Sequence, residues 1–195
     1  MVESMIVIAI VAVAVALAVP SFRDLIERKA VSGAAEAVYE QVQLARSEAL
    51  KRSKPILVDF YIDGADATNW AVGITDKMAG CAAEVTSGGT LCTVDYDNVA
   101  GTADLIAMRI VGADYKNIAM SQGTAFSTPG ALTGGCVTTS GAQSCFDFVR
   151  GLARSGAYQF ASANYTLRVE VSLLGNVRVC MPAGSKHIPG YIVCA

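Results

Sequence analysis

The first 54 residues carry a hydrophobic pattern that changes from uniform to periodic and predicts one long helix. Residues 5–19 are fifteen apolar residues without a break. Pro55 ends the pattern, because proline disfavours helical backbone in the residue before it. We expect an apolar half over 1–20 and an amphipathic half over 21–54. In the second half apolar residues recur at steps of three and four, the period of a helix with one buried face: Phe22, Leu25, Ile26, Ala30, Ala34, Val38, Val42, Ala45 and Ala49.

Such a helix is longer than a single domain can cover. At a rise of 1.5 Å per residue it spans on the order of 80 Å, whereas most globular helices have about 10–14 residues. About half of it is therefore expected to project from the domain. Pro20 lies inside the run and removes a backbone hydrogen bond, so we expect a kink or a locally melted turn there. Asp24 with Arg28 and Glu48 with Arg52 are favourable pairs at i,i+4 spacing.

Residues 55–195 predict a β domain, so the fold class is α+β. The segment 165–173 alternates apolar and polar residues with the two-residue period of a half-buried antiparallel strand. The segments 76–104 and 112–145 are rich in Gly, Ser and Thr and are expected to be loops. The expected strands are Ile56–Ile62, Trp70–Ile74, Leu105–Val111, Phe146–Val149, Tyr165–Leu173 and Val177–Cys180.

Six cysteines lie beyond residue 80, and their even number favours disulfides made in an oxidising compartment. Metal binding is the alternative, but no Cys-x2–4-Cys pair is present and His187 is the only histidine. Six cysteines allow fifteen connectivities. Pairing between sequence neighbours would give Cys81–Cys92, Cys136–Cys145 and Cys180–Cys194.

The composition offers little support for catalysis or for a highly charged partner. The formal net charge is −2 and charged residues make up 16% of the chain, which does not indicate an overall polyanion binder. A histidine-dependent catalytic group would need His187, which lies in a Lys-His-Ile-Pro segment expected to be a surface loop. No phosphate-binding loop is present, and we expect neither an enzyme nor a cofactor or metal. Asn164-Tyr165-Thr166 formally matches a glycosylation acceptor, a tripeptide that is common by chance.

The apolar run at residues 5–19 has two interpretations. It resembles the core of a secretory signal peptide in length. However, no small-x-small cleavage site follows it, and the helical pattern continues beyond it. The run with its flanking residues approaches the ~20 residues that span a bilayer. We therefore favour a retained membrane anchor.

The run MVESMIVIAIVAVAVALAVPSF resembles the N-terminal segment of type IV pilins and type II secretion pseudopilins, with Glu3 and Pro20 at the family's glutamate and proline positions. The segments 43–58, 70–73 and 175–180 are similar to the pseudopilin H and FimT-like branch. Family members have two residues before the position of Met1, usually Phe and a small polar residue, and a leader that ends in Gly. This departure leaves the mature N-terminus and its methylation open.

The resemblance implies a type IV pilin fold, with a long kinked helix packed on an antiparallel β domain that has disulfide-stapled loops. It implies a structural subunit that sits in the bacterial inner membrane before assembly and then in a filament at the cell surface. The implied partners are other copies or related pilins, prepilin peptidase and the assembly machinery. Glu3 is expected to pair with the N-terminal amine of a neighbouring subunit. The expected filament core is Met5, Ile6, Ile8, Ile10, Val11, Val13, Val15, Leu17, Val19 and Phe22.

Two alternatives to a pilus subunit remain open. One is a pseudopilin of a type II secretion system. The other is a DNA-binding minor pilin, because FimT-like proteins carry a Gly-Arg-x-Arg signature near the C-terminus. Here that stretch reads Gly175-Asn176-Val177-Arg178, so one arginine is missing. Arg168, Arg178 and Lys186 would be the DNA contacts, with Arg150 and Arg154 beside them. Scattered, solvated arginines are the favoured interpretation, since phosphate binding needs clustered cations.

Overall fold

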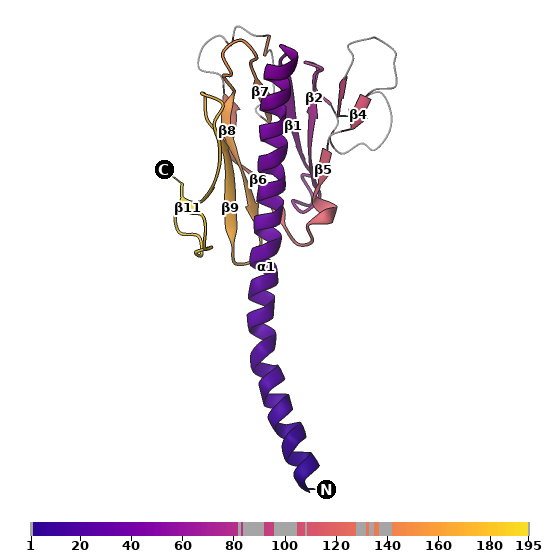
Figure 1. Ribbon diagram of the computed structural model, residues 1–195, viewed down its shortest axis with the longest axis vertical. Helices are drawn as coiled ribbons and strands as arrows, with labels where there is room; N and C mark the ends of the chain where they lie inside the picture. Colours follow the sequence, from indigo (N-terminus) through magenta and orange to yellow (C-terminus); the bar gives the residue numbers. More distant parts are fainter. Residues whose placement is uncertain are drawn as a thin grey trace.

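The computed structural model describes residues 2–81, 83, 92–95, 105–107, 109–127, 132, 135–136 and 142–194. The side chains of residues 3–4, 14–21, 95 and 105–107 are outside the described part. Figure 1 shows one long helix, α1, whose upper half lies against a β domain. Its lower half extends away from the domain to the N-terminus.

Helix α1 runs from Val2 to Arg52, close to the expected range. Ser53 then adopts a left-handed backbone with φ of 53°. The amide of Lys54 donates to the carbonyl of Ala49 at 3.3 Å. This is the Schellman arrangement, which satisfies carbonyls left open at the end of a helix. Pro55 follows directly and prevents a further turn.

The backbone stays helical through Pro20, so the expectation of a locally melted turn there is wrong. Proline removes one hydrogen bond, and the helical turns on either side hold the remaining ones. The projecting half of α1 curves gradually in Figure 1 and shows no break.

The β domain holds a four-stranded sheet in the order β5-β2-β1-β7, a five-stranded sheet in the order β11-β10-β9-β8-β6, and the pair β3-β4. Among the described pairs, β10 and β11 run parallel and the others antiparallel. A short 3-10 helix, η1, spans Gly112–Asp114. The strands are β1 (Ile56–Ile62), β2 (Trp70–Thr75), β3 (Thr93–Asp95), β4 (Leu105–Ala107), β5 (Arg109–Val111), β6 (Ala119–Ser127), β7 (Gln143–Phe146), β8 (Ser155–Ala161), β9 (Thr166–Val171), β10 (Val177–Met181) and β11 (Ile192–Val193).

Two strand predictions need correction in their bounds. The segment 105–111 was expected to form one strand, but β4 pairs with β3 whereas β5 pairs with β2 in a different sheet. The expected strand 146–149 ends at Phe146, because the side chain of Asp147 accepts a hydrogen bond from the amide of Val149 at 2.7 Å. That local bond stabilises a turn in place of a strand.

The expectation that 76–104 and 112–145 are loops is wrong where β3, β6 and β7 lie. The sequence of strand β6 shows no two-residue alternation, because its register against β8 shifts between Gln122 and Thr124 and again before Ser127. Such irregularities break the alternation of buried and exposed positions. Only Met120 and Phe126 of β6 are buried, so its sequence lacks a clear strand pattern.

The upper half of α1 belongs to the main core. Its buried face consists of small and medium side chains, which allow the helix to lie close to the sheets. On β9, Leu167, Val169 and Val171 are buried in the same cluster, so the predicted alternation is confirmed there. The buried helix residues are Val31, Ala34, Ala35, Val38, Val42, Ala45 and Ala49.

Aromatic side chains join the two larger sheets beneath the helix. The ring centroid of Phe60 on β1 lies 4.1 Å from that of Tyr158 on β8. Trp70 on β2 meets Phe160 on β8 edge-on at 5.3 Å. The indole of Trp70 donates to the carbonyl of Ile118 at 2.9 Å, so its polar atom is satisfied inside the core. The sheets and the helix therefore form one hydrophobic unit.

Candidate functional site

The projecting half of α1 exposes its apolar side chains. Apolar surface of this extent marks an interaction site in a folded protein. The predicted core residues Met5, Ile6, Ile8, Ile10, Val11, Val13 and Phe22 are between 55% and 72% exposed. The side chains of Glu3, Val15, Leu17, Val19 and Pro20 lie outside the described part. Within the described part of the chain, no helix is both long enough and apolar enough to serve as a membrane span.

A polar cluster joins α1 to the domain at the point where the helix leaves it. We call it the helix-base cluster; it consists of Asp24, Arg28, Tyr165 and Lys186. The hydroxyl of Tyr165 donates to Oδ1 of Asp24 at 2.7 Å and accepts from Nε of Arg28 at 2.9 Å. Nζ of Lys186 also donates to Oδ1 of Asp24 at 2.7 Å. Both cations lie over the Tyr165 ring, at 5.3 Å for Arg28 and 4.6 Å for Lys186.

The ionisation of the cluster follows from these contacts. Hydrogen bonds from Lys186, Tyr165 and Arg28 hold the pKa of Asp24 far below its usual range. The carboxylate of Asp24 in turn raises the pKa values of Arg28 and Lys186. The Asp24 carboxylate and the two cations therefore favour one another's charged forms at neutral pH.

Glu27 makes a second attachment between α1 and the turn before β9. Its carboxylate accepts from the backbone amide of Asn164 at 2.7 Å and from Nδ2 of the same residue at 2.9 Å. Hydrogen bonds from Ser162 and Asn164 lower the pKa of Glu27. The Asn164 amide of the formal glycosylation tripeptide is therefore already engaged in holding the helix.

The C-terminal segment also reaches the helix. The hydroxyl of Tyr191 donates to the carboxylate of Glu36. Burial, together with this neighbouring carboxylate, raises the pKa of Tyr191. Like the helix-base cluster, this contact attaches α1 to the domain.

The predicted DNA contacts are paired with carboxylates on two different elements, β9 and α1. Arg178 lies 2.8 Å and Arg168 3.4 Å from carboxylate oxygens of Glu170 on the five-stranded sheet. Lys186 instead pairs with Asp24 on the helix. Arg154 is only 6% exposed, and it donates to backbone carbonyls of β6 and β7. Placing Arg154 on a basic surface was therefore wrong, and the three predicted contacts already have carboxylate partners.

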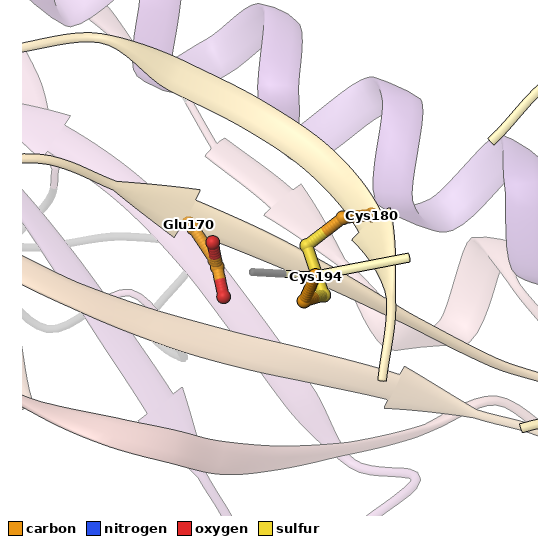
Figure 2. Close-up of side chains that lie close together, drawn as sticks. All are labelled: Glu170, Cys180 and Cys194. Carbon is orange, nitrogen blue, oxygen red and sulfur yellow. A yellow bond between two sulfur atoms is a disulfide. The ribbon is translucent and has the colours of Figure 1, made fainter. Parts of the chain in front are cut away.

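The three disulfides predicted from neighbouring cysteines are present: Cys81–Cys92, Cys136–Cys145 and Cys180–Cys194. Figure 2 shows Glu170 beside the Cys180–Cys194 bridge. One potential ligand atom from each of these residues lies within 4.8 Å of the others. The arrangement does not suit a metal, because disulfide sulfurs are not thiolates and Glu170 is shared by two arginines. The bridge instead staples the C-terminal segment to β10.

Sequence reasoning identified only part of the helix base. The pair Asp24 and Arg28 was visible from its i,i+4 spacing. Tyr165 and Lys186 were not linked to it, because more than 130 residues separate them from the helix in the sequence. No local pattern marks such a contact, which exists only after β9 and the C-terminal segment have packed against α1.

Comparison with known proteins identifies the family. The family model described as type II transport protein GspH matches residues 34–175, more than half of the chain. The chain therefore belongs to this family, which confirms the resemblance to the pseudopilin H branch.

Solved structures similar to this chain include a minor pseudopilin and a type IV minor pilin. One is the minor pseudopilin EpsH of the Vibrio cholerae type 2 secretion system, with 11% identity, 78% of this chain and 98% of that chain covered, and a TM-score of 0.45. Another is the type IV minor pilin FimU of Pseudomonas aeruginosa, with 13% identity, coverages of 83% and 96%, and a TM-score of 0.43. No curated protein sequence matches the chain. The family assignment rests on the family model.

Proposed function

We propose that this chain is a structural subunit of a pilus-like filament, either a pilus or a type II secretion pseudopilus. Before assembly the apolar half of α1 holds the subunit in the inner membrane, and afterwards the same half packs inside a filament at the cell surface. The observation that carries the proposal is the row of exposed apolar side chains on a helix that its own domain leaves uncovered.

The physical argument concerns where that apolar surface is stable. Burying one exposed Val, Ile or Met side chain contributes on the order of 1.5–3 kcal/mol. Met5, Ile6, Ile8, Ile10, Val11 and Val13 together would make an isolated subunit in water unfavourable. A lipid bilayer and a bundle of equivalent helices both bury such a surface while each helix satisfies its own backbone. The abundant Ala residues at 9–18 permit close helix packing in the bundle.

The partners follow from the family and remain part of the proposal. They are other copies of this chain or related pilins, with prepilin peptidase and the assembly machinery acting before and during polymerisation. Glu3 has the role of pairing with the N-terminal amine of a neighbouring subunit, because a carboxylate in an apolar segment is costly without a partner. No catalytic role is proposed for the chain.

The test is a single charged substitution in the apolar half with a matched substitution on the domain. Ile8 is 69% exposed on α1, and Leu174 is 65% exposed in the turn after β9. An Arg in the middle of a membrane helix costs about 2.5–3.5 kcal/mol on insertion scales. We expect Ile8→Arg to remove the chain from both the membrane fraction and sheared surface fibres of producing cells, and Leu174→Arg to leave both unchanged. Normal fibres with Ile8→Arg would contradict the proposal.

A further inference from the structure

The amphipathic half of α1 carries a second surface that the domain leaves open. Apart from Arg23, its exposed residues fall on one side of the helix when each residue advances by about 100°. We call this surface the exposed stripe. It consists of Phe22, Leu25, Ile26, Lys29, Glu36, Glu40, Ser47, Leu50 and Lys51.

The charges on the exposed stripe are regularly spaced. Lys29, Glu40 and Lys51 follow one another at intervals of eleven residues. Eleven residues make about three helical turns and rise about 16.5 Å, so the three side chains stand almost in line along the axis. These three side chains are therefore positive, negative and positive in order along the stripe, and Glu36 adds a second negative charge between Lys29 and Glu40. Lys51 has a loose contact of 3.8 Å with Glu48, yet its side chain remains 68% exposed.

We propose that a second copy of this chain packs in parallel along the exposed stripe, displaced by eleven residues. In this arrangement Lys29 of one copy faces Glu40 of the next, and Glu40 of the first faces Lys51 of the next. Without the displacement, each charged residue would lie beside the same residue of the neighbouring copy, and the two like charges would repel. The inference rests on the proposed filament function and adds the partner and the axial register of the contact.

The shape of the surface agrees with the same displacement. Phe22, which is 63% exposed, would come beside Gly33 of the neighbouring copy. Gly33 lines a groove of about 540 Å³ between α1 and the segment 188–191, and Ser32 and Glu36 line it too. A Cβ on Gly33 would lie 3.6 Å from Cε1 of Tyr115 in the same chain, so a neighbour's ring would enter the groove beside Gly33 and not the place of the missing side chain. Glu36 would come beside Ser47, which is uncharged and neither attracts nor repels the carboxylate.

The contact is heterologous, since it joins different residues of the two copies. Contacts of this kind generate open assemblies where the symmetry does not close. Exposed ion pairs contribute little affinity each. Their main effect across an interface is to select one register and to reject others. The apolar half of α1 would thus supply the affinity, and the exposed stripe would set the stagger.

Charge reversal in the full chain tests the proposal. Glu40→Lys gives three positive charges, and Lys29→Glu with Lys51→Glu gives three negative charges. Lys and Glu have similar helix propensity, so neither change should unfold α1. We expect each variant alone to need about a tenfold higher concentration to assemble. An equimolar mixture of the two variants should recover assembly, and so should the triple reversal. Lys77→Glu, in the exposed segment after β2, is the control for a single charge reversal outside the stripe.

The register is read by cross-linking. One preparation carries Glu36→Cys and another carries Ser47→Cys; the native cysteines are all in disulfides, so each chain has a single thiol. The proposal expects cross-links between 36 and 47 in the mixture and none between two copies of 36. Filaments that cross-link 36 to 36, or that tolerate every charge reversal, would overturn the stagger alone. If the chain with native charges does not associate at all, the proposed function fails as well.

Discussion

The hydroxyl of Tyr165 donates a hydrogen bond to the carboxylate of Asp24 at 2.7 Å, across 141 residues of sequence. Asp24 lies on α1 close to where the helix leaves the domain, and the Tyr165 side chain is fully buried at the start of β9. The contact joins the projecting half of the helix to the disulfide-bonded β domain. We infer that it holds the angle between them, which an ordered filament requires to be the same in every subunit.

Replacing Tyr165 by Phe should weaken the attachment of α1 to the domain without disturbing the hydrophobic core. The buried ring is retained, while the bonds to Asp24 and Arg28 are lost. Losing a hydrogen bond to a charged group costs about 1.5–3 kcal/mol, and solvent near the base reduces this, so we expect about 1–2 kcal/mol in the free energy of unfolding. Chemical denaturation of the purified chain measures it. The control is Tyr39→Phe, which removes only a contact with Gln43 within the helix. Equal losses of unfolding free energy in the two variants would contradict the proposed role of Tyr165 in attaching α1 to the domain.

Acid should weaken the contacts that hold residues 22–30 of α1 against the domain. The pKa values of Asp24 and Glu27 are both lowered in the folded chain. A group with a lowered pKa stabilises the fold above its unfolded value, near 4, and loses this contribution as pH falls toward the folded value. Amide hydrogen exchange of residues 22–30 should therefore be slow and constant above about pH 5, after correction for the intrinsic rate, and should accelerate below about pH 4. In Asp24→Asn, exchange should already be faster at pH 7 and vary less with acid.

Removing the Cys180–Cys194 bridge should destabilise the domain and free its C-terminal end. The two cysteines are 14 residues apart. Closing a loop of about 15 residues contributes about 3 kcal/mol in the chain-entropy account. Replacing both cysteines by Ala should lower the free energy of unfolding by about that amount, and proteolysis should then cut between residues 182 and 193 before the rest of the domain. Resistance of this segment equal to that of the native chain would show that β11 holds without the bridge.

Gly175 should be the least replaceable residue of the turn between β9 and β10. Its φ is 72°, and an added Cβ would lie 2.3 Å from the carbonyl oxygen of Gly151. Gly184 has a similar φ of 84° with nothing within 4 Å of such a Cβ, so it isolates the backbone effect. We expect Gly184→Ala to cost about 1 kcal/mol and Gly175→Ala about 2 kcal/mol more. Thermal unfolding of the two variants gives the comparison, and equal costs would contradict the close approach.

The parts of the fold that sequence reasoning located were those with a strong periodic signal. Helix α1 has the longest run of helical periodicity, and β9 has the clearest two-residue alternation. The pattern assigned four positions in the upper part of the helix to the buried face, and all four are buried: Val38, Val42, Ala45 and Ala49. Phe22, Leu25 and Ile26 share the apolar repeat but are exposed, because they lie on the side of the helix that faces away from the domain. Periodicity shows that a face is apolar and does not show what covers it.

The remaining elements depend on tertiary contacts. Strand β8 has small residues such as Gly156 and Ala157, and its neighbours β6 and β9 supply the hydrogen bonds that extend it. Arg154 seemed suited to a surface by its charge, but it is buried and bound by two backbone carbonyls. The helix-base cluster likewise depends on tertiary structure, because Lys186 contacts Asp24 only after the C-terminal segment has packed against α1.

Electron cryo-microscopy of fibres sheared from producing cells, with mass spectrometry of their content, tests the central claim most directly. The account predicts that fibres contain this chain, with the apolar halves of α1 bundled along the axis and the β domains outside. Fibres in which the β domains form the centre and residues 2–13 remain in solvent would contradict it, as would a chain that stays out of every filament.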